Sequence, residues 1–337
     1  MTLKKHVNIP VFIPHLGCPN NCVFCNQRSI SGTKCFDEGS VPDIIDRVLS
    51  GVPGGVETEI AFFGGSFTGI DRSLMIRMLN VAQGYIEDGR VKSIRLSTRP
   101  DYIDEERIEI LSRYGVKTVE LGIQSMRDEV LSASNRGHTA KDTERAVGLL
   151  TKAGFDVVGQ MMIGLPKSEV DDEIYTARSI CEMGAKGARI YPTAVFADTE
   201  LDKMRLRGEY LPLETEDAVE RTCQAMQVFD EYGVKVIRVG LCENDGLHTD
   251  SGISAGAFHP AFGELCAGRM YRYKIEKAIG ESDIRGKRLT VNVPKSDISK
   301  AVGNKGANRN YFIDKYGVSV FNVTSDTDSD FVMISEK

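Results

Sequence analysis

Residues 18–25 read Cys18-Pro19-Asn20-Asn21-Cys22-Val23-Phe24-Cys25, so three cysteines of the 337-residue chain stand within eight positions. The apolar, β-branched segment before them, residues 7–13, predicts a buried strand. The glycine, proline and asparagines that follow it predict a loop. Such a loop can place three sulfur atoms around one compact object. Thiolates are soft ligands that suit zinc or an iron–sulfur cluster.

The clustered cysteines do not match a closed structural zinc site. Such a site takes four ligands, and no fourth cysteine or histidine follows at a standard spacing: Cys35 lies ten positions after Cys25, and His15 lies on the strand side. A [4Fe–4S] cluster held by three thiolates keeps one iron open to an external ligand, unlike a four-cysteine cluster. A zinc loop and a chance grouping remain the alternatives.

The C-x3-C-x2-C spacing, with Phe24 directly before the third cysteine, resembles the radical S-adenosylmethionine (SAM) superfamily. The resemblance implies that Cys18, Cys22 and Cys25 hold a [4Fe–4S] cluster beside Phe24, and that its open iron binds the amino and carboxyl groups of SAM. It also implies that an electron, from a donor such as flavodoxin or ferredoxin, splits SAM to a 5′-deoxyadenosyl radical.

Strand-like and helix-like segments alternate through the first ~240 residues, which predicts parallel βα units in an α/β fold. We expect strands at 8–13, 57–63, 92–97, 117–122, 156–163 and 187–193, with 235–240 as a possible addition, and helices at 41–50, 71–87, 104–114, 140–153, 168–184 and 215–232. Six units make a partial (β/α)6 TIM-type barrel, the fold that the resemblance also implies. Its chemistry is expected at the carboxyl ends of the strands.

Polar and glycine-rich segments follow these strands. After the second strand comes FGGSFT at 63–68, where the superfamily holds the SAM amino group; the residues there are Gly64, Gly65 and Ser66, and Ser66 replaces the common glutamate. Two glycines let a backbone approach a ligand closely. A glycine pair after a strand is equally an ordinary tight turn.

The whole series of strand-end segments is similar to the catalytic subunit of Elongator, a tRNA-modifying enzyme, and more loosely to oxygen-independent coproporphyrinogen III oxidase. The resemblance covers most of residues 8–265. It implies cofactor contacts for Ser97, Gln124, Arg136 and Gln160, with Arg136 near the SAM carboxylate, which suits its bidentate donors. Ser97 stands where relatives often have Glu, and Gln160 where the oxidase has Asp. His138 is equally explained as a helix cap.

The net charge of −6 conceals a basic segment. Residues 285–323 carry eight Lys or Arg and two Asp, whereas residues 324–337 carry four acidic side chains and one lysine. The basic segment alternates as a strand at 288–293, then shows helical spacing at 295–302. A second helix at 307–316 and a strand at 318–323 follow the loop Gly303-Asn304-Lys305-Gly306.

This strand–helix–GxxG–helix–strand order resembles the core of a KH domain. In that reading Gly303, Asn304, Lys305, Gly306 and Arg309 bind RNA, because glycines admit phosphates to the backbone and basic side chains attract them. A small module that merely packs on the barrel is the alternative. We therefore expect a barrel over 1–240, an extension over 241–284 that closes the active site, a KH-like α+β module over 285–323 and an acidic tail over 324–337.

The leading hypothesis is a radical SAM enzyme that modifies a base of tRNA or rRNA. We expect it to lack the acetyltransferase domain of Elongator-type enzymes, so acetyl-coenzyme A chemistry of the Elongator kind is not expected. The alternatives are an anaerobic oxidase of a small, porphyrin-type molecule and an RNA- or ribosome-associated factor with a structural or sensory cluster. The longest apolar runs fall far below the ~18 residues of a membrane span, so we expect a cytoplasmic protein with no membrane partner.

Overall fold

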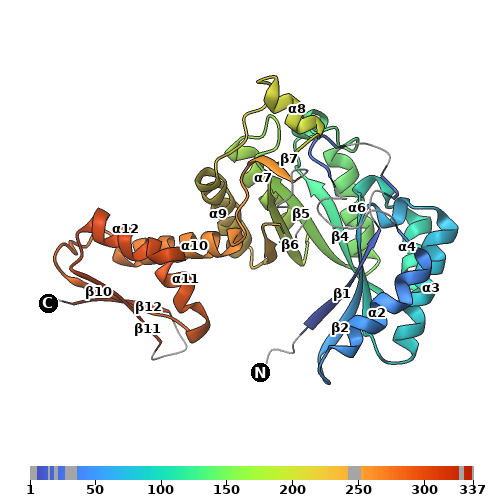
Figure 1. Cartoon of the computed structure of the whole chain (residues 1–337), viewed down its shortest axis with the longest axis horizontal. Coiled ribbons are helices and arrows are strands. Elements are labelled where there is room, and N and C mark those ends of the chain that lie inside the picture. Colours follow the sequence, from blue (N-terminus) through green and yellow to red (C-terminus); the bar gives the residue numbers. More distant parts are fainter. Residues whose placement is uncertain are drawn as a thin grey trace.

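The computed structural model describes residues 6–13, 16–18, 22–26, 36–241, 252–325 and 330–335. Its main element is a curled sheet of seven strands, all parallel, in the order β1–β2–β3–β4–β5–β6–β8 (Figure 1). The strands are β1 (His6–Ile13), β2 (Glu57–Gly64), β3 (Ser93–Thr98), β4 (Val116–Gln124), β5 (Asp156–Ile163), β6 (Gly187–Pro192) and β8 (Lys235–Val239). The partial barrel is confirmed, and the possible additional strand is its seventh.

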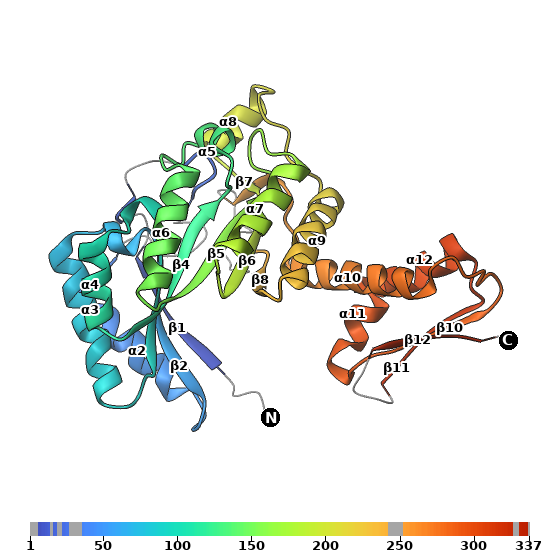
Figure 2. The same cartoon turned by 180° about the vertical axis from the view of Figure 1, so that it is seen from behind.

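Helices cover the outer face of this sheet, as Figures 1 and 2 show. They are α2 (Val41–Ser50), α3 (Arg72–Glu87), α4 (Glu105–Arg113), α6 (Ala140–Lys152), α7 (Val170–Glu182) and α9 (Thr215–Glu231). Side chains cap several N-termini: Asp71 accepts from Leu74 N, and Asp104 from Arg107 N. Such caps satisfy backbone donors that the helix itself leaves open.

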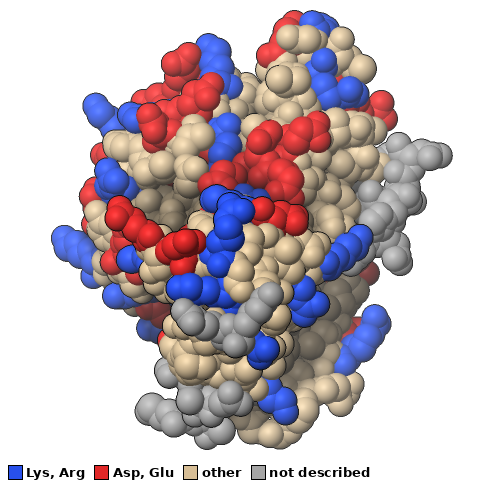
Figure 3. All heavy atoms as spheres, turned by 90° about the vertical axis from the view of Figure 1, so that its left-hand side faces the viewer, with Lys and Arg blue, Asp and Glu red and all other residues tan. Residues whose placement is uncertain are grey.

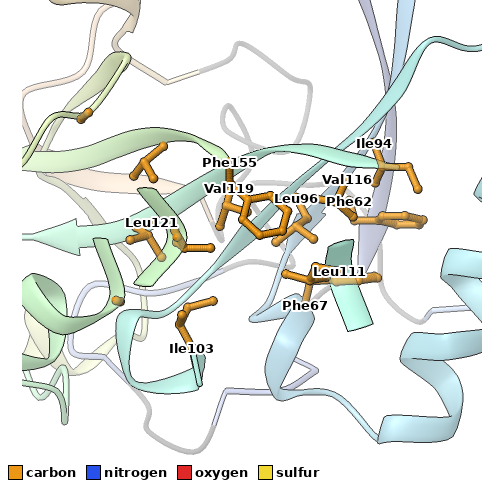
Figure 4. Packing of buried hydrophobic residues seen from close by; sticks show 14 of the residues in the cluster. Phe62, Phe67, Ile94, Leu96, Ile103, Leu111, Val116, Val119, Leu121 and Phe155 are labelled. Atoms are coloured by element: carbon orange, nitrogen blue, oxygen red, sulfur yellow. The ribbon is translucent and has the colours of Figure 1, made fainter. Parts of the chain in front are cut away.

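The core lies between this outer face and the helices, because side chains alternate along each strand. Ile9, Val11 and Ile13 of β1 are all buried in it, while the residues between them face the inner side of the curl. Figure 4 shows the central part, where the rings of Phe62 and Phe67 stack with centroids 4.5 Å apart. The outward set of each strand is thus apolar, and the inward set is free to be polar.

Four short elements near the carboxyl ends of the strands were not expected. They are α5 (Asp128–Ala133), β7 (Ala194–Phe196), α8 (Glu200–Leu206) and β9 (Ile253–Gly256). β7 pairs with β9 in an antiparallel two-stranded sheet, so residues after the barrel return to the end of β6. Residues 242–251, which include Cys242, lie outside the described residues, as does Cys35.

The C-terminal module follows α10 (Phe262–Ile279), which leads away from the barrel (Figure 1). The expected order is present: β10 (Arg288–Asn292), α11 (Ile298–Val302), the glycine loop, α12 (Ala307–Tyr316) and β11 (Val320–Thr324). The segment expected to be an acidic tail also contributes β12 (Phe331–Ser335), which pairs antiparallel with β10. Its alternating apolar residues Val332 and Ile334 pack on the module's core, so a charge count concealed a strand.

The inner face of the sheet carries a buried ion cluster. Glu120 on β4 is fully buried, and it accepts from Arg95 Nη1 on β3 and from Arg189 Nη2 on β6, both at 2.9 Å. Arg95 also pairs with Glu59 on β2, 3.0 Å away. These ion pairs join β2, β3, β4 and β6 across the inner face of the sheet.

We predict that Glu120→Gln lowers the free energy of unfolding by about 3 kcal/mol, because it leaves two buried arginines without their shared carboxylate. The control is Glu106→Gln, which breaks an exposed pair with Arg72 and should change stability by less than about 1 kcal/mol. Urea unfolding followed by circular dichroism measures both. Equal effects of the two variants would show that the cluster adds nothing to stability.

Candidate functional site

The chain entering the cysteine segment lies directly on the glycine-rich end of β2. Gly65 N donates to Ile13 O at 2.8 Å, and Ser66 N donates to Leu16 O at 3.0 Å. A Cβ on Gly65 would lie 2.0 Å from Leu16 O, and one on Gly17 would lie 2.1 Å from Ser66 O. Both positions therefore need glycine, since any side chain would push the two backbones apart.

Ser66 uses its hydroxyl within the protein. It is fully buried, it shares a 2.8 Å hydrogen bond with Thr98 Oγ1, and it accepts from Arg99 N at 3.1 Å. This serine therefore ties the end of β2 to the end of β3. Its contact with SAM remains a prediction.

Two predicted residues meet over Gly122 at the end of β4. Arg136 Nη2 donates to Gly122 O at 2.6 Å, and a Cβ on Gly122 would lie 3.1 Å from both Arg136 Nη2 and Gln124 Nε2. Gln124 has a φ of 67°, the left-handed region that side chains rarely adopt. Backbone strain is thus held at Gln124, close to the point where Arg136 reaches the cysteine segment.

Arg136 also reaches the cysteine segment itself. Its Nη1 lies 3.3 Å from Cys22 Sγ, and its side chain is buried. Backbone bonds fix the segment from two further sides, because Val23 N donates to Ser134 O and Leu201 N donates to Val23 O. Phe24 packs against the cluster of Val23, Val195, Leu201 and Tyr210. The unexpected α8 and β7 therefore position the cysteine segment.

Burial and two arginines set the charge state of the groups around the cysteines. Burial raises the pKa of the Cys18 thiol, Cys22 adds to the rise, and Arg136 and Arg99 oppose it. Burial, with Arg136 and Arg99, lowers the pKa of His138 to about 4. The imidazole of His138 is therefore neutral at pH 7.

Several buried side chains here leave a polar atom without a hydrogen-bond partner among the described residues, and three of these atoms are Arg99 Nη1, Gln124 Oε1 and His138 Nδ1. Arg99 is held by Asp101, which accepts from its Nε and Nη2, both at 2.9 Å. His138 Nε2 lies 3.3 Å from Ile123 O, so this nitrogen carries the proton and Nδ1 is an acceptor. Thr139, rather than His138, caps the following helix.

One open donor and two open acceptors fit the amino-acid end of SAM, whose carboxylate accepts and whose ammonium group donates. The three cysteines form no disulfide in the described part of the chain and lie at the same edge. Within the described ranges no three Cys, His, Asp or Glu side chains already converge as a metal site. The residues therefore fit the cofactor pair by chemistry, and Cys18, Cys22 and Cys25 are the candidates to hold a cluster.

The remaining predicted cofactor residues, Ser97 and Gln160, lie on the inner face of the sheet beside Glu120. Gln160 Nε2 donates to Glu120 Oε2 at 2.9 Å and lies 3.4 Å from Ser97 Oγ. The structure thus brings Ser97 and Gln160 together, as part of the ion cluster around Glu120. Their contact with SAM remains a prediction.

The chain matches two family profiles, one described as the radical SAM superfamily over residues 12–179 and one as the Radical_SAM C-terminal domain over residues 185–272. The chain belongs to the radical SAM superfamily. Enzymes of this superfamily use a [4Fe–4S] cluster and SAM. The expectation drawn from the cysteine spacing is confirmed at the level of family, enzyme class and cofactors.

Several curated proteins are similar to this radical SAM chain. An uncharacterized protein of Methanocaldococcus jannaschii is 28% identical over 68% of this chain and 74% of its own length. The tRNA uridine(34) acetyltransferase of Methanocaldococcus infernus is 34% identical over 56% of this chain, and Elongator complex protein 3 of Dictyostelium discoideum is 28% identical over 64%. The chain spans only 34% and 41% of the lengths of these last two.

Solved structures show the same fold. The structure of archaeal Methanocaldococcus infernus Elp3 with an N-terminal deletion superposes with a TM-score of 0.64 at 24% identity, and the match covers 85% of this chain and 66% of that one. Coproporphyrinogen III oxidase from Escherichia coli gives a TM-score of 0.50 at 15% identity. Both similarities concern architecture.

Cys18, Cys22 and Cys25 would hold the cluster, which would supply the electron for reductive cleavage of SAM. The chain's own residues position the cysteines. The close backbone contacts of Gly17 and Gly65 fix the start of the cysteine loop, and Arg136 places a cation beside Cys22. Sequence reasoning missed Arg99 and Asp101, although RPD at 99–101 directly follows a predicted strand. It also missed Glu120, whose signal was a glutamate at an alternating position inside an apolar strand.

We predict that Cys22→Ala abolishes cluster uptake, because two thiolates cannot hold three irons of the cluster. Anaerobic reconstitution with iron and sulfide, followed by iron analysis and visible absorption, measures it. Cys181→Ala, at a buried free thiol on α7, is the matched control and should load normally. A loaded Cys22→Ala protein would remove these cysteines from the cluster site.

Proposed function

We propose that this protein is a radical SAM enzyme that modifies a base of tRNA or rRNA. The observation that carries the proposal is the combination of the cysteine site with a basic, KH-like module on the same chain. A generator of radicals needs a substrate held nearby, and an acidic barrel by itself would repel phosphates. The module supplies the missing attraction.

The geometry of the glycine loop supports RNA binding. Gly303, Lys305 and Gly306 all have φ between 50° and 80°, so the loop backbone turns sharply ahead of α12. The side chains of Lys305 and Arg309 are exposed at this turn. In Figure 3, which views the module's end of the molecule, basic side chains predominate on the lower half of the face and acidic ones gather above. Phosphates are attracted to such a surface.

The loop is also fixed firmly to the rest of the protein. Asn308 is buried, its Nδ2 donates to Gly268 O on α10 at 2.8 Å and to Ala301 O at 3.1 Å, and its Oδ1 accepts from Arg272 at 3.1 Å. The loop therefore keeps its shape without RNA, which reduces the entropy lost on binding. α10, whose Gly268 O accepts the hydrogen bond from Asn308, connects the barrel to the module.

The names of the relatives agree with an RNA substrate, since two of them are a tRNA uridine(34) acetyltransferase and an Elongator complex protein. Oxidation of a small molecule is the second candidate, because the strand-end segments of the sequence also resemble, more loosely, those of oxygen-independent coproporphyrinogen III oxidase. It leaves the basic module and its preformed loop without a role. The described residues include no helix that is both long and apolar enough to cross a membrane.

We predict that RNA stimulates cleavage of SAM. The reduced, cluster-loaded protein is incubated with SAM and small cellular RNA, and 5′-deoxyadenosine is measured by chromatography. RNA should raise its formation well above the rate without RNA, and Cys22→Ala should form none. Stimulation by a porphyrin precursor but not by RNA would favour the second candidate. No turnover with any substrate would favour a structural or sensory cluster.

We predict that Lys305→Gln/Arg309→Gln weakens RNA binding several-fold and lowers the slope of log affinity against log salt by about 2, because two phosphate contacts are lost. These exposed positions are chosen because a Cβ on Gly303 would lie 2.8 Å from Asn308 N and distort the loop. The control, Lys141→Gln/Lys152→Gln on exposed positions of α6, removes the same charge. Equal effects in filter binding would exclude the loop as the RNA site.

A further inference from the structure

Two phenylalanines face the inner side of the curled sheet, although Val11 and Ile13 beside the first and Phe62 before the second belong to the core. Phe12 on β1 pairs in register with Phe63 on β2, and their ring centroids are 6.3 Å apart at an angle of 45°. Phe12 is 36% exposed, and neither ring belongs to a buried apolar cluster of the described residues. Two aromatic side chains are thus kept out of the core at the carboxyl ends of the first two strands.

Their surroundings place them beside the cofactor site. Phe63 directly precedes Gly64 and Gly65, and the cysteine segment lies against Gly65 through the hydrogen bond from Gly65 N to Ile13 O. The guanidinium of Arg189 lies 5.6 Å from the centre of the Phe63 ring. Because Glu120 holds Arg189 in place, the Phe63 ring is backed by a fixed cation.

The inner face around Glu120 is unfavourable for apolar ligands, because the ion pairs of Glu120 with Arg95 and Arg189 occupy it. Gln160 Nε2 is directed to Glu120, so the amide oxygen Oε1 is turned away from that carboxylate and remains an acceptor. The inner face therefore offers aromatic rings at one edge and a fixed acceptor on β5. A flat, heterocyclic ring with N–H donors suits this combination better than a purely apolar ligand.

We propose that Phe12 and Phe63 form a stacking platform for one unpaired RNA base, which is thereby held within reach of the cofactor. This inference rests on the proposed function. Enzymes that react with a base take it out of the stack, and aromatic side chains replace the stacking that the base loses. Stacking on an aromatic ring tolerates any base. The platform therefore binds the base without selecting among bases, and polar groups nearby would make that selection.

The test uses Phe12→Ala in the full-length, cluster-loaded protein with small cellular RNA. We expect RNA affinity by filter binding and SAM affinity by calorimetry to stay within twofold of wild type, since phosphates and cofactor bind elsewhere. The RNA-stimulated formation of 5′-deoxyadenosine should fall at least about fivefold, because base stacking is lost. Phe12→Trp, which keeps a stacking surface, should retain most of the stimulation.

The outcomes separate this inference from the proposed function. Wild type without RNA stimulation refutes the proposed function and the platform together. Stimulation in wild type that persists unchanged in Phe12→Ala refutes the platform alone. If Phe12→Ala does not load its cluster, Phe63→Leu decides by the same readouts, and undiminished stimulation in that variant overturns the platform.

Discussion

The close backbone contact between residues 16–18 and the glycine-rich end of β2 is the constraint on which the site depends. Gly65 and Gly17 each have a backbone carbonyl within 2.1 Å of where a Cβ would lie, so the contact exists only because both are glycines. It fixes where the cysteine segment leaves β1. Ser66 extends the same contact to β3 through Thr98 and Arg99, so three strand ends become one rigid edge.

A polar inner face is the second consequence of this architecture. The open curl leaves the inner face without the layered apolar filling of a closed barrel, and Glu120 with Arg95 and Arg189 joins its strands by charge instead. Arg99 and Arg136, which lie nearer the cysteines, are also held by acceptors within the protein. Each is anchored by an acceptor within the protein, Asp101 or Gly122 O, and so remains in position with a cation presented to the site.

The sequence predicted the parts that local patterns determine. Alternating apolar segments gave the parallel strands, and the C-x3-C-x2-C spacing gave the family. It did not predict contacts between distant positions: Glu120 with Arg189, or Asn308 with Gly268. Such pairs carry no local signal, because their meaning depends on the topology that brings the strands and helices together. β12 was missed for a different reason, since the net charge of residues 324–337 concealed its alternating apolar side chains.

The central claim is that the radical chemistry of this chain acts on RNA. Mass spectrometry of nucleosides from cells with and without the protein tests it most directly. The account predicts at least one modified nucleoside of tRNA or rRNA that disappears without the protein, returns with the wild-type chain and does not return with Cys22→Ala. Identical nucleoside profiles in all of these cells would contradict it.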